Sequence, residues 1–263
     1  MISFTIAGFQ AYQWLKERCT VAPASGAPQT TEDLVLRLWA ADAIPALSGV
    51  KLYKIINEVI RLDDLATPTD ERPSALFSAC VSLVCMMQLF LGASRRNPSG
   101  LPRCWPRGEH AAGLDQSSEA HVVWRGGGLP LEHVRFYEQL ANPSGNGRVY
   151  RVPGLLASSF SKSKARDEFM LPAIRAGDAG VLWKIELVKD DDGGCKHVNF
   201  LGEYSEYNEK EFLFGTYSTF RVLSVTDQDK ATRATTNGGI KITLRACVDN
   251  SEEMEDVPSA PWY

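Results

Sequence analysis

The sequence predicts an α+β fold in which a helical N-terminal lobe packs on a mixed, mostly antiparallel β-sandwich. Apolar residues recur at one-face helical spacing in the first part of the chain. After residue 118 they fall instead into short β-branched and aromatic runs separated by Gly, Pro, Asn or Asp. With 263 residues, 44% of them hydrophobic and 23% charged, the chain is long enough to bury a substantial core.

The helical lobe is expected over residues 32–100. Residues 1–31 are predicted to be an extension, because they end in a small, proline-bearing, uncharged linker. Residues 32–41 and 50–62 each place apolar side chains on one helical face. Residues 75–93 are uncharged and just long enough to span a bilayer, but polar side chains interrupt them. We therefore favour a buried helix over a membrane span at this segment.

The β-rich lobe is expected over residues 119–248, which follow a loop rich in Arg, Pro, Gly and Ser. Together with residues 32–100 it forms one predicted domain, residues 32–248. A short helix is expected over residues 164–170, between two strands. The tail, residues 249–263, has five acidic residues and no basic one, so we expect it to be solvated or partner-binding. The expected strands are residues 121–124, 149–152, 180–188, 211–214, 220–225 and 240–248.

Charge and cysteine content narrow the function classes. The chain has 28 Lys and Arg against 32 Asp and Glu, a net charge of -4, whereas nucleic-acid and acidic-membrane binders normally carry a basic excess. The 6 cysteines form no C-x-x-C pair and no zinc-finger spacing with histidine, so no metal site is predicted. Residues 1–16 do not resemble a secretory signal. We expect reduced thiols, no nucleic-acid or membrane partner, and a cytoplasmic location, either in the producing cell or after delivery into a host.

The first chemical motif is residues 122–128 (VVWRGGG), predicted to be a strand that ends in Arg125, followed by glycines that include Gly126 and Gly127. Arginine offers a rigid fork of donors for phosphate oxygens, and glycine lets a ligand approach the backbone. The second motif is residues 153–161 (PGLLASSFS), which enter the short helix. Hydroxyls at such a junction hold a carboxylate or a ribose in place, although they cap helices more often.

The third motif is residues 206–214 (EYNEKEFLF). On a strand, Glu209 and Glu211 point to the same side with Cα atoms about 6.6 Å apart. Two carboxylates that face one cleft form a pair of the kind used on glycosidic bonds. The alternative is a solvated strand edge, with the glutamates outward and Phe212 and Phe214 inward.

In this order, the three motifs resemble the arginine–serine–glutamate signature of the mono-ADP-ribosyltransferase family, which reads R-G, S-T-S and E-x-E. Residues 52–61 (LYKIINEVIR) look like the N-terminal helix of the family, and residues 180–185 (GVLWKI) resemble the strand that leads to the glutamates. The resemblance covers roughly residues 32–226. It implies a β-sandwich of the ADP-ribosyltransferase type and NAD as co-substrate.

The resemblance also implies a role for each motif. Glu211 takes the catalytic position, where it bonds the ribose 2′-hydroxyl and stabilises the positive charge that develops as nicotinamide leaves. Glu209 orients the acceptor arginine and takes its proton. Arg125 holds the NAD phosphates, and the backbone around Gly126 and Gly127 contacts the nicotinamide amide.

The serine motif departs from the family pattern. Aligned with S-T-S, the chain has Ala157, Ser158 and Ser159, so the first serine, which usually supports the catalytic glutamate, is an alanine. In this register Ser158 and Ser159 are the candidate hydroxyls, Ser158 for catalysis and both for NAD binding. A shifted register that uses Ser159, Phe160 and Ser161 remains open.

Four aromatic residues complete the candidate site. Phe160 and Phe169 are candidates for the ring that closes the nicotinamide pocket. Tyr204 and Tyr207 lie in residues 202–208, which match the substrate-recognising turn of the family, and are candidates for contact with the protein acceptor.

The expected function is transfer of ADP-ribose from NAD to arginine side chains of target proteins, with release of nicotinamide. Within the family, glutamate at the position of Glu209 accompanies arginine modification, so the expected partner is a protein with an exposed arginine. Two alternatives stay open. One is an NAD glycohydrolase on the same scaffold, in which water replaces the acceptor, and the other is a catalytically inactive interaction module.

Overall fold

The computed structural model describes residues 53–54, 56–58, 60, 122–141, 147–187, 195, 197–201, 211–227, 239–248 and 257–261. The chain divides into two compact units, residues 1–93 with 203–208 and residues 94–202 with 209–263. In the first unit the described residues are helical, and Ile56 and Ile60 are buried. The other helices expected for the N-terminal lobe lie outside the described residues. Where the structure describes the chain, no helix has the length and apolar character needed to span a membrane.

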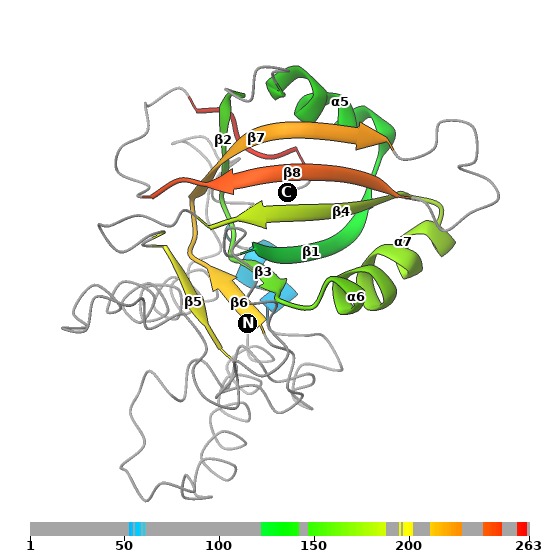
Figure 1. Ribbon diagram of the computed structural model, residues 1–263, viewed down its shortest axis with the longest axis horizontal. Coiled ribbons are helices and arrows are strands. Elements are labelled where there is room, and N and C mark those ends of the chain that lie inside the picture. The colour runs from blue at the N-terminus through cyan, green and yellow to red at the C-terminus, as the bar shows by residue number, and fades with distance from the viewer. Residues whose placement is uncertain are drawn as a thin grey trace, which may run out of the picture. The chain divides into compact units, whose positions relative to one another are not determined.

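The described part of the second unit contains one sheet of eight strands, in the order β2-β7-β8-β4-β1-β3-β6-β5 (Figure 1). The pairing is mostly antiparallel, as predicted, and only β4 and β8 run parallel among these strands. The strands are β1 Val122–Leu129, β2 Val149–Val152, β3 Leu156–Ser159, β4 Ala179–Glu186, β5 Val198–Phe200, β6 Glu211–Phe214, β7 Ser218–Asp227 and β8 Ile240–Ala246.

The expected β-sandwich is one bent sheet. A single register pair, Trp124 with Ser159, joins β1 to β3, whereas β1 and β4 pair along their whole length. Figure 1 shows β3, β5 and β6 running at an angle to the long strands β1, β4, β7 and β8. Because so little pairing holds β3 to β1, the sheet turns there, and buried residues of both parts, such as Trp183 and Phe212, join one core.

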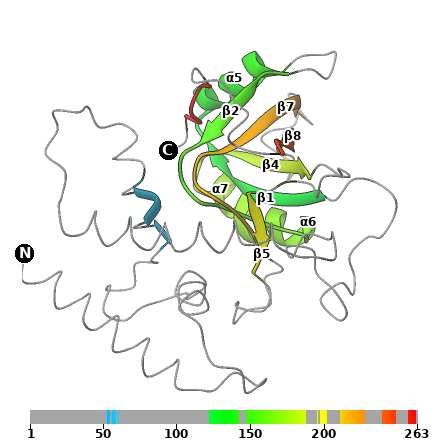
Figure 2. The same ribbon diagram turned by 90° about the vertical axis from the view of Figure 1, so that its left-hand side faces the viewer.

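Among the residues that the structure describes, two helical segments lie on this sheet. Helix α5, Leu131–Leu140, contacts β7 and buries Val134, Tyr137 and Leu140. The other segment joins α6 (Lys162–Lys164), the π-helix η4 (Ala165–Met170) and α7 (Leu171–Arg175), and it contacts β1. It includes the helix predicted over residues 164–170. Figure 2 shows α5 near β2 and β7, and α6 and α7 near β1.

The sequence predicted a strand that ends at Arg125. Strand β1 instead continues through the three glycines to Leu129. The physical reason is the space that the glycines leave. A Cβ on Gly126 would overlap the carbonyl oxygen of Ala165, and one on Gly128 would lie 2.6 Å from the Cβ of Asp178. The glycines therefore allow the helical segment to pack directly on the backbone of β1.

The C-terminal tail also differs from the expectation of a solvated extension, at residues 257–261. Ser259 forms a parallel bridge with Arg151 on β2, and Ala260 is buried in the core. The Arg151 amide donates to the Pro258 carbonyl at 2.8 Å, and the Ala260 amide donates to the Arg151 carbonyl at 2.8 Å. These bonds occupy the polar groups of a sheet edge, which favours packing over solvation.

Candidate active site

A pocket lies where the sheet bends, between β1, β3, β6 and the helical segment. It contains about 410 Å³ of space free of protein atoms, part of which opens to solvent. Segments more than 80 residues apart in the sequence meet there. The residues that line it are Trp124, Arg125, Gly126, Ala157, Ser158, Ser159, Lys164, Ala165, Phe169 and Glu211. The pocket thus collects residues from all three sequence motifs.

Strand register places Glu211 in a row of pocket residues. Ser159 pairs with Glu211 across β3 and β6, and Trp124 pairs with Ser159 across β1 and β3. Directly opposed residues of antiparallel strands project to the same face, with Cβ atoms about 4.5–5.5 Å apart. Glu211, Ser159 and Trp124 therefore project together from three neighbouring strands.

Glu211 is not on a solvated strand edge. Only 7% of its surface is exposed, and β6 pairs with β3 on one side and β5 on the other. The Leu201 amide also donates to the Glu211 carbonyl at 2.8 Å. The alternative in which this glutamate points into solvent is wrong, and a buried carboxylate at a pocket is instead typical of a functional group.

The three serines have different surroundings. Ser158 is buried, and its hydroxyl donates to the Phe212 carbonyl at 3.1 Å, which ties β3 to β6. The Ser159 hydroxyl accepts a hydrogen bond from the Ser161 amide at 3.1 Å. Ser161 caps α6, because its hydroxyl accepts from the Lys164 amide at 3.2 Å. Ser159 is thus the serine directly opposite Glu211, whereas Ala157 lies opposite Leu213.

Arg125 and Gly126 form the β1 side of the pocket. The Nη1 atom of Arg125 donates to the Ala157 carbonyl at 2.8 Å, which links β1 to β3 beside their single register pair. This bond fixes one branch of the guanidinium at the pocket wall. Gly126 is covered by the backbone of η4, so the width of the pocket at this point depends on the missing side chain.

The two candidate aromatic residues lie in different environments. Phe169 lines the pocket from η4 and is 49% exposed, so its ring is accessible to a ligand. Phe160 does not line the pocket but packs edge-on against Phe212, with ring centroids 4.3 Å apart. Gly127 is also absent from the lining, since its Cβ position faces the Trp183 ring. Glu209, Tyr204 and Tyr207 lie outside the described residues.

Sequence reasoning missed Trp124 and Lys164, both of which line the pocket. Trp124 immediately precedes Arg125, and Lys164 lies in a Lys-rich run after the serines, so proximity to the motifs was the available signal. The Nζ atom of Lys162 lies 5.1 Å from the Trp124 ring centroid, within range of a cation–π interaction. Among the described residues, no group of three or more His, Cys, Asp or Glu side chains is placed to hold a metal ion.

Comparison with known proteins identifies solved structures that have a similar fold. No protein-family model matches the sequence, and no curated protein sequence matches it. Solved structures do match, and the class they define is the ADP-ribosyltransferase fold. One of these structures is Vis, described as a toxin and an ADP-ribosyltransferase from Vibrio splendidus, which this chain matches with a TM-score of 0.52 and 13% identity over 98% of this chain and 89% of Vis.

Two further Vis structures give the same result. One contains the M6 inhibitor and matches with a TM-score of 0.53 and 14% identity, over 98% of this chain and 88% of Vis. The other contains agmatine and matches with a TM-score of 0.52 and 12% identity, over 98% and 89% of the two chains. At such low identity the likeness shows the fold alone, and it agrees with the fold type that the sequence motifs implied.

Proposed function

We propose that the chain is an NAD-dependent mono-ADP-ribosyltransferase that modifies arginine side chains. One observation carries the proposal, namely the meeting of Arg125, Ser159 and Glu211 at one pocket although they come from three separate strands. The sequence motifs singled out these residues independently of their position in space. Their convergence in a fold shared with Vis supports a common chemistry.

Glu211 has the central role in the proposed reaction. The bond between ribose C1′ and the nicotinamide nitrogen breaks, and nicotinamide leaves as a neutral molecule with the bonding electrons. The positive charge left on the ribose is stabilised by the Glu211 carboxylate, which also accepts a hydrogen bond from the 2′-hydroxyl. Burial of Glu211 supports this role, because charge interactions strengthen where water is excluded.

Ser159 is proposed to orient Glu211. The Ser159 oxygen accepts a hydrogen bond from the Ser161 amide. Its hydroxyl hydrogen is left to donate to an acceptor, and Glu211 is the residue directly opposite on β6. Ser158, whose hydroxyl bonds to the backbone of β6, is proposed to hold the strand that carries Glu211 in place. In this assignment the hydroxyl that supports the glutamate is the third residue of the serine motif rather than the first.

The remaining NAD contacts follow from the pocket lining. Arg125 is proposed to hold a phosphate, and the backbone at Gly126 to hold the nicotinamide amide. Phe169 rather than Phe160 is proposed to stack on nicotinamide, because only Phe169 lines the pocket. Gly127 is proposed to help position strand β1 and not to contact NAD directly.

The acceptor side of the proposal rests on the second glutamate of the sequence motif. A guanidine nitrogen forms the new bond to ribose C1′, and the proton that it loses passes to Glu209. Tyr204 and Tyr207 are proposed to contact the target protein. Agmatine, present in one Vis structure, is a small guanidino compound and a suitable model acceptor. Since Vis is described as a toxin, action in the cytoplasm of a host cell is part of the proposal.

The test is incubation of the purified chain with NAD labelled in the ADP-ribose part, with and without agmatine. Four proteins are compared, namely wild type, Glu211→Gln, Glu209→Gln and Glu138→Gln. Glu138 is an exposed residue on α5 that does not line the pocket, so it controls for loss of a carboxylate as such. Nicotinamide release and labelled agmatine are measured separately.

The expected result differs for each variant. Glu211→Gln loses both nicotinamide release and transfer, by on the order of 100-fold or more, because a preorganised charge is removed. Glu209→Gln loses transfer to agmatine but keeps NAD hydrolysis, and Glu138→Gln behaves as wild type. Nicotinamide release without labelled agmatine in wild type would refute the arginine acceptor and favour the glycohydrolase. A wild-type chain that neither binds nor cleaves NAD would refute the enzyme and favour the interaction module.

A further inference from the structure

The row of side chains that contains Glu211 continues beyond the pocket. Across β6, β3 and β1 this row consists of Glu211, Ser159 and Trp124. Trp124 pairs in turn with Lys184 on β4, and Lys184 pairs with Thr243 on β8. Residues that pair across neighbouring strands project to the same face of a sheet. The face that carries Glu211 therefore extends across β4 to β8.

Basic side chains gather on this face beyond the pocket. Arg221 on β7 pairs with Arg245 on β8, and Arg245 pairs with Glu186 on β4, so these three residues form a second row. Lys241 lies four residues before Arg245 on β8 and projects to the same face, because side chains alternate along a strand. Lys184, Lys241, Arg221, Arg245 and Glu186 are called the basic face below. Among the described residues of β4, β7 and β8 on this side, four are cations and one is a carboxylate.

The basic face lies on the side of the sheet opposite to the core. Ile242 and Leu244 alternate with the polar residues of β8 and are buried in the core. Helix α5 packs on that apolar side, because its buried residues belong to the same core cluster. The Arg245 side chain is 51% exposed. A partner molecule can therefore reach the basic face.

The charges of the basic face are only partly neutralised. Nζ of Lys184 lies 3.1 Å from Oε1 of Glu186, and Nη2 of Arg245 lies 3.6 Å from Oε2 of the same carboxylate. Arg221 directly opposes Arg245, and its Nη1 atom donates to the Gly147 carbonyl, a neutral acceptor, at 2.7 Å. Like charges that directly oppose each other across a sheet are destabilising. An anion bound over these two arginines would relieve that repulsion.

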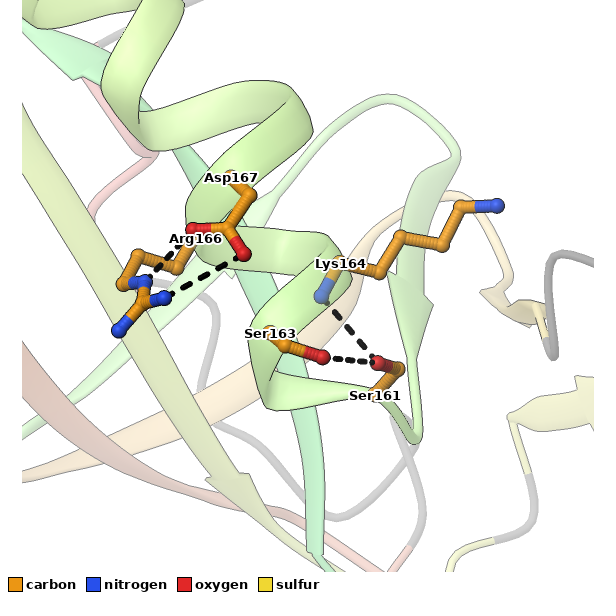
Figure 3. A network of polar contacts seen from close by, with 5 residues as sticks. All are labelled: Ser161, Ser163, Lys164, Arg166 and Asp167. Atoms are coloured by element: carbon orange, nitrogen blue, oxygen red, sulfur yellow. Dashed lines mark hydrogen bonds and ion pairs between the residues drawn. The ribbon is translucent and has the colours of Figure 1, made fainter.

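A cation on the neighbouring helical segment has the opposite arrangement. Figure 3 shows the Arg166 guanidinium joined to the Asp167 carboxylate, with contacts of 2.7 Å and 3.3 Å. This bond raises the pKa of Arg166 and lowers the pKa of Asp167, so both groups keep charges that cancel each other. For Lys241 the part of the chain that the structure describes supplies no such carboxylate. The net positive charge is thus a feature of the basic face and not of the helical segment beside it.

We propose that the basic face binds an acidic segment of the target protein and so presents a nearby arginine of that protein to the pocket. This inference rests on the proposed function and names the chemistry of its acceptor, an arginine flanked by carboxylates. Neighbouring strands are about 4.8 Å apart, so Lys184 lies within about 14 Å of Glu211, three strands away. An extended segment rises about 3.3 Å per residue, so carboxylates about four to six positions from the arginine reach Lys184 and the cations of β8.

A protein segment fits the basic face better than a nucleic acid does. Nucleic-acid affinity grows with the number of phosphates that a protein neutralises, and an extended polyanion would also meet the rest of a chain whose net charge is -4. A short acidic segment needs only the few cations of β4, β7 and β8. The proposed reaction already brings a protein to the adjoining pocket.

The test uses two synthetic peptides that contain one arginine each. The acidic peptide has glutamates about four to six positions away on both sides of the arginine, as the strand spacing requires, and the amide peptide has glutamines there. Wild type is compared with the double variant Lys241→Gln/Arg245→Gln, with Glu186→Gln and with Arg135→Gln. Arg135 is the matched control, an exposed cation on α5, which packs on the opposite side of the sheet. The readouts are the calorimetric Kd for each peptide, and kcat and KM for transfer of ADP-ribose to each peptide and to agmatine.

Wild type is expected to bind the acidic peptide about tenfold more tightly than the amide peptide, because several exposed ion pairs each contribute a small factor. This preference is expected to fall as salt is raised from about 0.05 M to 0.5 M. The double variant is expected to reduce the preference to about twofold, with agmatine kinetics within about twofold of wild type because agmatine has no carboxylate. Glu186→Gln is expected to lower the Kd for the acidic peptide about twofold, since it removes the competing carboxylate. Arg135→Gln is expected to behave as wild type.

Four results would overturn the inference. They are equal Kd values for the two peptides with wild type at low salt, an unchanged preference in the double variant, an equal loss in Arg135→Gln, and tighter binding of a single-stranded oligonucleotide of the same charge than of the acidic peptide. The proposed function fails separately. If the acidic peptide binds in an Arg245-dependent manner but neither peptide nor agmatine is labelled, the binding surface is supported and the transferase is refuted. Transfer to agmatine and to both peptides alike would support the transferase and refute the binding surface.

Discussion

The close approach of the π-helix to β1 predicts a graded response to Ala substitution of three consecutive glycines. A Cβ on Gly126 would overlap the Ala165 carbonyl oxygen and lie 3.0 Å from the Met170 amide nitrogen. Both atoms are backbone, so no side-chain rotation relieves the overlap and η4 itself has to move. A Cβ on Gly127 would lie 3.3 Å from the edge of the Trp183 ring, a contact that a small ring shift relieves.

These contacts determine how much each substitution is expected to lower the free energy of unfolding. Overpacking a close contact costs about 1–3 kcal/mol, and we place Gly126→Ala at about 3 kcal/mol because its neighbours cannot rotate away. In a strand, replacing glycine by alanine also contributes about 0.5–1 kcal/mol of stability. Gly127→Ala is therefore expected within about 1 kcal/mol of wild type. Gly128→Ala falls between them, since its Cβ would lie 2.6 Å and 2.7 Å from the Cβ atoms of Asp178 and Ala173.

The assay is urea unfolding of the three variants, together with thermal unfolding and NAD cleavage. A loss of about 3 kcal/mol corresponds to a melting temperature lowered by about 6–12 °C in a domain of this size. Because η4 carries Phe169, Gly126→Ala is also expected to raise the KM for NAD at temperatures where it remains folded. Wild-type stability in Gly126→Ala, or a larger loss in Gly127→Ala than in Gly126→Ala, would refute the reasoning.

Three other substitutions test separate contacts. Phe169→Ala is expected to leave the free energy of unfolding within about 0.5 kcal/mol of wild type, because the ring is 49% exposed, and to raise the KM for NAD severalfold; a loss above about 2 kcal/mol would mean that the ring serves the core. Ser158→Ala is expected to lose about 1 kcal/mol in urea unfolding with its bond to the Phe212 carbonyl; unchanged stability with lost activity would transfer the role at Glu211 from Ser159 to Ser158. Burial raises the pKa of Tyr150 well above 10.0, so the unfolded chain releases this proton first and stability falls as the pH rises above that value. Tyr150→Phe should therefore lose less stability than wild type between about pH 10 and 11, and an equal loss would contradict this.

The strands that the sequence predicts best are those bounded on both sides by residues that favour turns. Residues 149–152 and 211–214 coincide with β2 and β6, because each is a β-branched or aromatic run bounded by residues that favour turns or loops. The sequence did not predict β3 and β5, of four and three residues, whose sequences LASS and VNF have no clear alternation. Both pair with β6, so their extended state depends on a partner strand more than on local preference.

Helix α5 was missed for a different reason. Its buried residues Val134, Tyr137 and Leu140 do recur at helical spacing, but the segment has only ten residues and begins directly after Pro130. The glycines before it suggested that the chain leaves the sheet at Arg125. Only the contacts made by η4 and α7 explain why glycine is needed inside β1, and those contacts join residues about 40–50 positions apart.

The types of residue at the candidate site could be predicted from the sequence. Which of their side chains lie on the same face of the sheet could not. A shift of one residue in strand register moves every side chain to the other face of a sheet, and no sequence feature of the serine motif fixes its register against β6. The structure pairs Ser159 with Glu211 and Ala157 with Leu213. The same holds for Lys164, which lines the pocket from α6, next to the close contact of η4 with Gly126.

This register changes the meaning of Ala157. Successive residues on one face of a strand are about 6.6 Å apart, so a serine at position 157 would place its hydroxyl opposite Leu213 and one full repeat away from the row of Ser159 and Glu211. The alanine therefore removes no hydroxyl that directly opposes Glu211. Its departure from the S-T-S pattern was the feature that kept the glycohydrolase open. With Ser159 opposite the carboxylate, that feature gives no physical reason to expect hydrolysis in place of transfer, and the choice between the two reactions depends on Glu209, the residue proposed to orient the acceptor.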